Sequence, residues 1–556
     1  MVYCVVTMFI DDQTYKRGGK TYRRVLMRNS FRTNGRVLHE TVANLSKCDD
    51  EEIEALKLAL KHKGDLQSLA IVSEDVMTKQ GQSVGALFLL RQLAKKLGIT
   101  RALGGCREAK LVLWLVFSAI MEQGSRLSAV RLAQRHAVCE LLNLDAFNED
   151  DLYAAMDWLE ERQATVERKL FAHRYGEEPP RLYLYDVTSS YLEGTQNELA
   201  AWGYNRDGKK GKLQIVIGLL TDSMGRPVSI EVFPGNTNDL STFGNQVKKV
   251  QERFDGQNVV FVGDRGMIKG PQIEALPEDF HYVSAISKPQ IEKLLTDGVF
   301  QMELFDETVC ETIGGNIRYI LRRNPVRARE LAETRNDKRA SIETLAERKN
   351  KHLEEHPRAQ PGVAKRDLQT FVEKLKFGRF AKVRYRGRTV LVEFDEDQIA
   401  EAGNLDGCYA IKTDLVDAHE VGAQEVHDRY MELTEVEWAF RTMKTVLLEM
   451  RGIFVRKEGR TRAHVFIIML AYLLAFELRH LWQDQEVTVE EGLRDLAELC
   501  ATEVIVGSAS AQTVPEPRDS GKALLKAAGV SLPDAIACRN VKVVTRKKLV
   551  PERRSS

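Results

Sequence analysis

The feature that most constrains the fold is a run of five strand-like segments between residues 181 and 287. The first three are RLYLYDVTSS, KLQIVIGLLTD and RPVSIEVFP, and the short turn DSMG separates the second from the third. A turn of this length joins antiparallel strands. The helical segment LSTFGNQVKKVQERF then leads to NVVFVGDRG, and HYVSAIS follows. Because helical crossovers favour parallel pairing, the first and fourth segments are predicted to be neighbours in one sheet.

Three strands in a meander, a helix and two further strands form the order of the ribonuclease H-like fold. An aspartate ends each of the two predicted neighbours: Asp186 in LYLYDVTSS and Asp264 in VVFVGDRG. Each aspartate alone is explained equally well as a loop cap. Side by side, however, two carboxylates repel and raise each other's pKa, and a divalent cation between them would remove the repulsion.

A third acid is predicted on the helix YMELTEVEWAFRTMKTVL. At 100° per residue, one polar stripe contains Tyr430, Glu437, Arg441 and Lys444. The flank with Phe440, Met443 and Leu447 can pack on the sheet. Taken alone, the helix is explained better as an ordinary amphipathic helix with a Glu437–Arg441 pair.

The spacing of this helix resembles a family signature, Y-x2-R-x3-E-x6-K. The chain has Tyr430, Glu437 and Lys444 in that spacing, and Leu433 stands where the signature has Arg. Together with YDVTSSYLEG and VGDRGM, the pattern is similar to that of a superfamily of DDE insertion-sequence transposases, the IS-four superfamily. The resemblance covers about 180–290 and 425–480.

The resemblance implies a bacterial, cytoplasmic transposase that cleaves DNA at the ends of its element and transfers the strands to target DNA. Asp186, Asp264 and Glu437 would be catalytic and would hold two Mg²⁺ ions, with Mn²⁺ able to substitute. Tyr430 and Lys444 would contact DNA phosphates. The helical wheel, not the family, suggests Arg441 as a substitute for the arginine missing at Leu433. The partners would be the terminal inverted repeats, target DNA and a second copy in a homodimer.

Other residues are weaker candidates. The loop residues Arg206, Lys209, Lys210 and Lys212 either track phosphates or belong to a solvated hairpin. Arg265 either touches DNA or pairs with a neighbour. The sequence further predicts turns and a helix cap at Asn236, Asn238 and Asp239, a core position for His464, and burial rather than base stacking for Trp202 and Trp438.

The fold class predicted is α/β, with a ribonuclease H-like core, a helical N-terminal region and a large α+β insertion before the last acid. The predicted regions are a β unit at 1–48, a helical DNA-binding and dimerisation region at 49–176, core at 177–289, insertion at 290–424, the catalytic helix at 425–482, and a C-terminal region with a basic tail at 483–556. The apolar stretches Leu111–Met121 and Val465–Leu478 are predicted to be buried helices, not membrane spans. The net charge of +1 means that any DNA contact must come from local basic patches.

Three other functions stay open at this stage. The same site would serve a structure-specific nuclease that does not join strands. A DNA-binding protein derived from a transposase would need no chemistry, although three intact acids argue against it. A phosphatase with Asp186 as nucleophile is weakest, because Thr188 holds the place of the second aspartate in the DxDxT motif.

Overall fold

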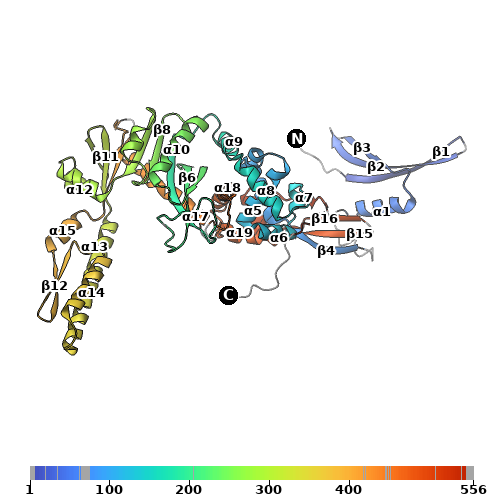
Figure 1. The fold of residues 1–556 in the computed structure, drawn as a ribbon. Coiled ribbons are helices and arrows are strands. Elements are labelled where there is room, and N and C mark those ends of the chain that lie inside the picture. The colour runs from blue at the N-terminus through green and yellow to red at the C-terminus, as the bar shows by residue number, and fades with distance from the viewer. Residues whose placement is uncertain are drawn as a thin grey trace. The chain divides into compact units, whose positions relative to one another are not determined.

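The computed structural model describes residues 7–18, 20–33, 36–61, 63, 76–204, 206–417, 419, 421–444, 447–448, 450, 453–506, 509–539 and 541–545 (Figure 1). The chain divides into two compact units. The first unit takes residues 1–82, 500–516 and 533–539, and the second takes 83–499, 517–532 and 540–556.

The first unit begins with an antiparallel sheet in the order β1-β2-β3. Its strands are β1 (Thr7–Arg17), β2 (Lys20–Thr33) and β3 (Arg36–Asn44). Thr33 pairs with Arg36, which confirms the predicted hairpin, while its turn residues Asn34 and Gly35 lie outside the described residues.

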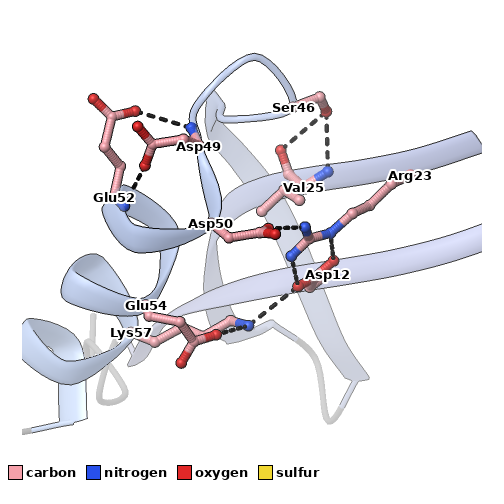
Figure 2. A network of polar contacts seen from close by, with 9 residues as sticks. All are labelled: Asp12, Arg23, Val25, Ser46, Asp49, Asp50, Glu52, Glu54 and Lys57. Carbon is pink, nitrogen blue, oxygen red and sulfur yellow. Dashed lines mark hydrogen bonds and ion pairs between the residues drawn. The ribbon is translucent and has the colours of Figure 1, made fainter.

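A polar network holds helix α1 (Asp50–Lys61) to this sheet (Figure 2). Arg23 of β2 donates to Asp12 of β1 and to Asp50 of α1. Lys57 of α1 donates to Asp12 at 3.1 Å. Arg23, and then Lys57, hold the pKa of Asp12 well below its ordinary value. Ion pairs at the surface therefore carry much of this contact between helix and sheet.

The chain returns to the first unit near its C-terminus. A second sheet has the order β17-β16-β15-β4 and contains β4 (Val76–Ser83), β15 (Cys500–Val506), β16 (Ala509–Thr513) and β17 (Ala535–Ile536). The sequence after Trp482 predicts helix and then loops, so strands β15, β16 and β17 correct that prediction. The predicted basic segment RKKLVPERR lies outside the described residues.

The second unit opens with helices, as predicted for 84–175. They are α3 (Gly85–Lys96), α4 (Ile99–Leu103), α5 (Arg107–Met121), α6 (Arg126–Arg135), α7 (Val138–Leu142), α8 (Glu149–Glu160) and α9 (Gln163–Tyr175). Helix α18 (Glu458–Leu481) packs against α5 and α8. Helix α18 is long and apolar enough to cross a membrane, but 83% of its most apolar window is buried inside the protein. Burial of both apolar stretches within helices is thus confirmed.

An eight-stranded mixed sheet forms the centre of the second unit, in the order β10-β11-β14-β9-β8-β5-β6-β7. Its strands are β5 (Leu182–Tyr191), β6 (Gln214–Asp222), β7 (Pro227–Pro234), β8 (Val259–Gly263), β9 (Phe280–Ala285), β10 (Cys310–Gly314), β11 (Ile317–Arg323) and β14 (Cys408–Thr413). The β5–β6–β7 meander is antiparallel, and β5, β8 and β9 are parallel, as predicted. The segment predicted as an insertion contributes β10, β11 and β14 to the same sheet.

Aromatic side chains fill the core between this sheet and helix α10 (Asp239–Arg253). Phe261 of β8 lies at the centre of the aromatic cluster, with ring centroids 5.9 Å from Tyr183, 5.4 Å from Phe243 and 5.9 Å from Phe280. All four side chains are buried. The core fixes β5 and β8, which carry two of the predicted acids.

The long polar helix α13 (Pro325–Glu355) has a small core of its own. Figure 1 shows it beside α14 (Pro361–Lys374), and the hairpin β12 (Ala381–Arg386) and β13 (Thr389–Phe394) completes the subdomain. Ile342 and Leu353 of α13 are buried against Leu368 and Val372 of α14. The sequence predicted α13 as exposed or as a coiled-coil arm, and it did not predict α14.

The remaining short elements connect these parts. They are α11 (Gly270–Glu274), α12 (Lys288–Thr296), the 3₁₀ turn η1 (Met302–Leu304), α15 (Glu396–Asn404), α16 (Ala423–Met431), α17 (Leu433–Lys444), α19 (Val489–Ala497) and α20 (Asp519–Ala527).

Candidate active site

Asp186 lies in the middle of β5, not at its end as predicted, because the strand continues to Tyr191. Pairing with β6 runs along the whole strand. Pairing with β8 stops at Tyr185, so Asp186 is the first residue beyond the parallel ladder. Its Oδ1 accepts a hydrogen bond from the amide of Val187 at 2.7 Å. The strand therefore does not end at Asp186, but its contact with β8 does.

Asp264 directly follows β8, as predicted. The register pairs Tyr185 with Gly263, so Asp186 and Asp264 occupy the next positions on two parallel neighbours. Asp264 is exposed, and its Oδ1 accepts a hydrogen bond from the amide of Arg265 at 2.7 Å. The exposed side chain of Arg265 is also at this edge of the sheet.

Glu437 comes from α17, which packs against β5. Its side chain is exposed, whereas Val436 and Phe440 are buried. Burial, together with the charges of Asp264 and Glu437, raises the pKa of Asp186 to about 7, against the opposing effects of the Val187 amide and of Arg206. The structure thus brings the three predicted acids within electrostatic range of one another.

The described residues contain no group of three or more His, Cys, Asp and Glu side chains drawn close enough to hold a metal ion. The three acids are therefore near one another without forming a closed coordination shell. Their chemistry still fits a hard divalent cation, since all their donors are carboxylate oxygens and they repel one another.

The region around these acids matches known protein families. The model of the transposase DDE domain matches residues 177–474, which is more than half of the chain. The chain belongs to the transposase DDE domain family. The model of the IS1634 family transposase N-terminal domain matches residues 11–72, so two separate parts of the chain identify an insertion-sequence transposase. None of the curated proteins matches this chain.

The transposase does not carry the signature residues on one helix. Helix α16 ends at Met431, and α17 begins at Leu433. Glu432 forms a tighter turn between them, and its carbonyl accepts a hydrogen bond from the amide of Glu435 at 2.8 Å. Leu433 is buried, and the exposed stripe of α17 contains Thr434, Glu437 and Arg441. The prediction that Tyr430, Glu437, Arg441 and Lys444 share one stripe of a single helix was therefore wrong. Phe440 and Met443 are buried, as predicted.

Tyr430 lies on α16 and reaches the acids of the DDE domain. Burial raises its pKa to about 12, and the charge of Asp264 is the next cause. Arg441 is exposed and lines a pocket of about 680 Å³ with Trp438 and Arg479. The guanidinium of Arg479 lies 3.9 Å from the ring centroid of Trp438.

Lys444 is buried inside the transposase. Its Nζ donates to Thr188 Oγ1 at 2.9 Å and to Ser189 O at 2.6 Å, and it lies 2.6 Å from Asp207 Oδ1. Lys444 therefore ties α17 to strand β5 and to the loop at 192–213. The sequence predicted a phosphate contact here and missed Asp207.

The 192–213 loop exposes aromatic and basic side chains beside β5. Trp202 is 67% exposed and Tyr204 is 82% exposed, so the predicted burial of Trp202 was wrong. Lys210 is exposed, whereas Lys212 pairs with Glu193 at 3.0 Å. Lys209 lies over the ring of Tyr191 at 5.7 Å.

Asp239 is a fourth acid near the site. Asn238 caps α10, as predicted, by accepting from the amide of Leu240 at 3.2 Å. Asp239 pairs with Arg206 at 2.5 Å. A Cβ on Gly266 would lie 3.8 Å from Asp239 Oδ2 and 4.0 Å from Asp264 Oδ2, so both acids border the same glycine. Asp239 was predicted only as part of a turn and helix cap, and nothing in the sequence indicated that it approaches Asp264.

Proposed function

We propose that this transposase binds the ends of a bacterial insertion sequence, cuts the DNA strands there and joins them to target DNA. The observation that carries the proposal is the register of β5 and β8, which leaves Asp186 and Asp264 at adjacent positions, with Glu437 on the helix that packs against β5. Carboxylates that approach one another in this way favour a bound cation. Asp186, Asp264 and Glu437 would then be the catalytic acids.

The strand order around Asp186 supports a ribonuclease H-like core. The order β7-β6-β5-β8-β9, with an antiparallel meander followed by parallel strands, agrees with that fold. The additional strands β10, β11 and β14 extend the sheet beyond β9.

DDE transposase domains generally use divalent metal ions. We propose that Asp186, Asp264 and Glu437 hold two Mg²⁺ ions, with Mn²⁺ able to substitute, because all their donors are hard oxygens. Such ions, when bound, would supply activation of the attacking oxygen and stabilisation of the leaving oxygen.

DNA would approach on the exposed side of α17 and β8. Arg265, Arg441 and Lys210 present exposed basic side chains for phosphates, and Tyr430 lies near Asp264. Lys444 could reach a phosphate only by leaving Asp207, and Lys212 only by leaving Glu193. As in the family, we place the protein in the bacterial cytoplasm, with a homodimer holding two element ends.

The test is to incubate the protein with duplexes carrying the element's ends, with target DNA and with Mg²⁺. The proposal predicts nicked ends and then joined strands, and no products in EDTA. Nicks without joining would favour a structure-specific nuclease. Binding without nicks would favour a DNA-binding derivative and would refute the proposed chemistry.

A further inference from the structure

A cavity of about 300 Å³ lies in the helical part of the second unit, apart from the three acids. Helices α5, α6, α8 and α18 and the segment after α17 all contribute to its wall. Most of the wall is apolar, including Leu115, Ile453 and Ile467. Two aromatic side chains, Tyr153 and the 75% exposed Phe454, also line it.

Arg126 contributes a positive charge to the wall of this cavity. Its Nη1 donates to Met156 Sδ at 3.4 Å, and its Nη2 lies 3.4 Å from Nδ1 of His464. Across the part of the chain that the structure describes, no carboxylate lies within ion-pair distance of it. A partly buried guanidinium with only a thioether and an imidazole as partners has unused donors and no compensating charge.

His464 makes the cavity more suitable for an anion. Burial, and then the charge of Arg126, lower the pKa of His464 to about 3, so the ring is neutral at physiological pH. Arg126 can only donate, so Nδ1 of His464 accepts and Nε2 carries the ring proton. The histidine therefore adds a second donor and no negative charge. The acid in the wall, Glu122, pairs with Arg135 at 2.6 Å.

We propose that this cavity binds a nucleotide, with its phosphate on Arg126 and its base among the apolar and aromatic side chains. A guanidinium suits the phosphate, and flat rings at an apolar wall suit the base. The cavity is at the small end of the range for ligand sites, which fits a ligand of one nucleotide. The nucleotide comes either from solution or from an unpaired position of a DNA strand.

The cavity also borders the link between two parts of the catalytic region. Leu448, Met450 and Ile453 follow α17 and line the cavity. The amide of Ile453 donates to Tyr191 O at 3.3 Å, at the end of the strand that carries Asp186. A bound nucleotide would therefore contact Ile453, whose amide is bonded to the end of β5.

The test is calorimetric titration in EDTA with 2′-deoxyadenosine 5′-monophosphate, deoxyadenosine and inorganic phosphate as separate probes. The monophosphate is expected to bind at least about tenfold more tightly than either fragment, because only it uses both parts of the cavity. Arg126→Met is expected to lose at least about tenfold in affinity for the monophosphate. Arg131→Met, on the same helix but outside the cavity wall, is the matched control and is expected to bind normally.

A second variant, Ala119→Leu, fills the cavity without changing a charge and is also expected to weaken binding. A single-stranded oligonucleotide with a terminal phosphate distinguishes the two sources of the ligand. Arg126-dependent binding of the oligonucleotide alone would assign the site to a DNA strand. Equal binding of the monophosphate by the wild type and Arg126→Met, or no Arg126-dependent binding of either probe, would overturn the proposal. Because EDTA prevents metal-dependent cleavage, failure of this site is distinguishable from failure of the proposed function.

Discussion

The first sheet of the first unit and the central sheet of the second unit are held in different ways. In the first unit, α1 meets β1 and β2 through Arg23, Asp12 and Lys57 at the surface. In the second unit, buried rings such as Phe261 join β5, β8 and α10. The comparison shows that the candidate site is supported by an apolar core, and salt has little effect on the stability of such a core. The contact of α1 with its sheet depends instead on charges, which salt screens.

Removal of the Phe261 ring should have the largest effect on stability. Phe261→Ala is expected to lower the free energy of unfolding by about 4 kcal/mol, because the cavity cannot be refilled between three other rings. Urea unfolding followed by tryptophan fluorescence measures it. Tyr385→Ala, at a half-exposed position on β12, is the control and should change stability by less than about 0.5 kcal/mol. Equal losses in the two variants would contradict the central position of Phe261.

Loss of the buried carboxylate of Glu167 should have the second-largest effect on stability. It accepts from Ser229 at 3.0 Å and from Gln163 at 2.9 Å, and it pairs with Arg253. Glu167→Ala is expected to cost about 3 kcal/mol, since a buried network loses its acceptor. The same urea experiment tests it, and a loss that disappears in 1 M NaCl would show a surface pair instead.

Acid should weaken the helical part of the second unit. His136 is buried and His464 is half-buried, and loss of solvation lowers their pKa values to about 4 and about 3. Below pH 6.5 these histidines bind protons in the unfolded chain but stay neutral in the native protein. The free energy of unfolding therefore decreases as the pH falls from about 6.5 toward 4. Each histidine contributes up to about 1.4 kcal/mol per pH unit. Thermal unfolding from pH 7 to 4.5 should show a shallower slope in His464→Gln, and an unchanged slope would contradict this account.

The smallest effect is expected in the first unit. Asp12→Asn removes the negative charge that Arg23 and Lys57 share. It should lower stability slightly at low salt and not at all in 1 M NaCl, because salt screens exposed charges. Thermal unfolding at both salt concentrations tests it, with Glu54→Gln as a control that removes one contact of Lys57 only. A large loss that persists in high salt would mean that the network is not a surface feature.

The sequence predicted the central strands well, because the apolar segments around Asp186 and Asp264 alternate with turns of characteristic length. It also predicted which acids approach one another, since parallel pairing of β5 and β8 fixes the relation of Asp186 and Asp264. The turn at Glu432 and the burial of Lys444 were not predictable from a helical wheel, because both depend on packing against β5 and on Asp207. The segment GCYAIKTD, which is β14, was predicted as a strand, but its pairing with β11 and β9 was not, and β15 beside β4 was not predicted, because these partners are far away in the sequence.

The most direct test of the central claim is Mg²⁺-dependent cleavage of end DNA by Asp186→Asn, Asp264→Asn and Glu437→Gln. Glu435→Gln, on the same helix as Glu437, is the matched control. The account predicts that each of the first three variants loses cleavage by at least about a thousandfold while still binding end DNA, and that the control cuts normally. Near-normal cleavage by any one of the three would contradict a site built from these acids.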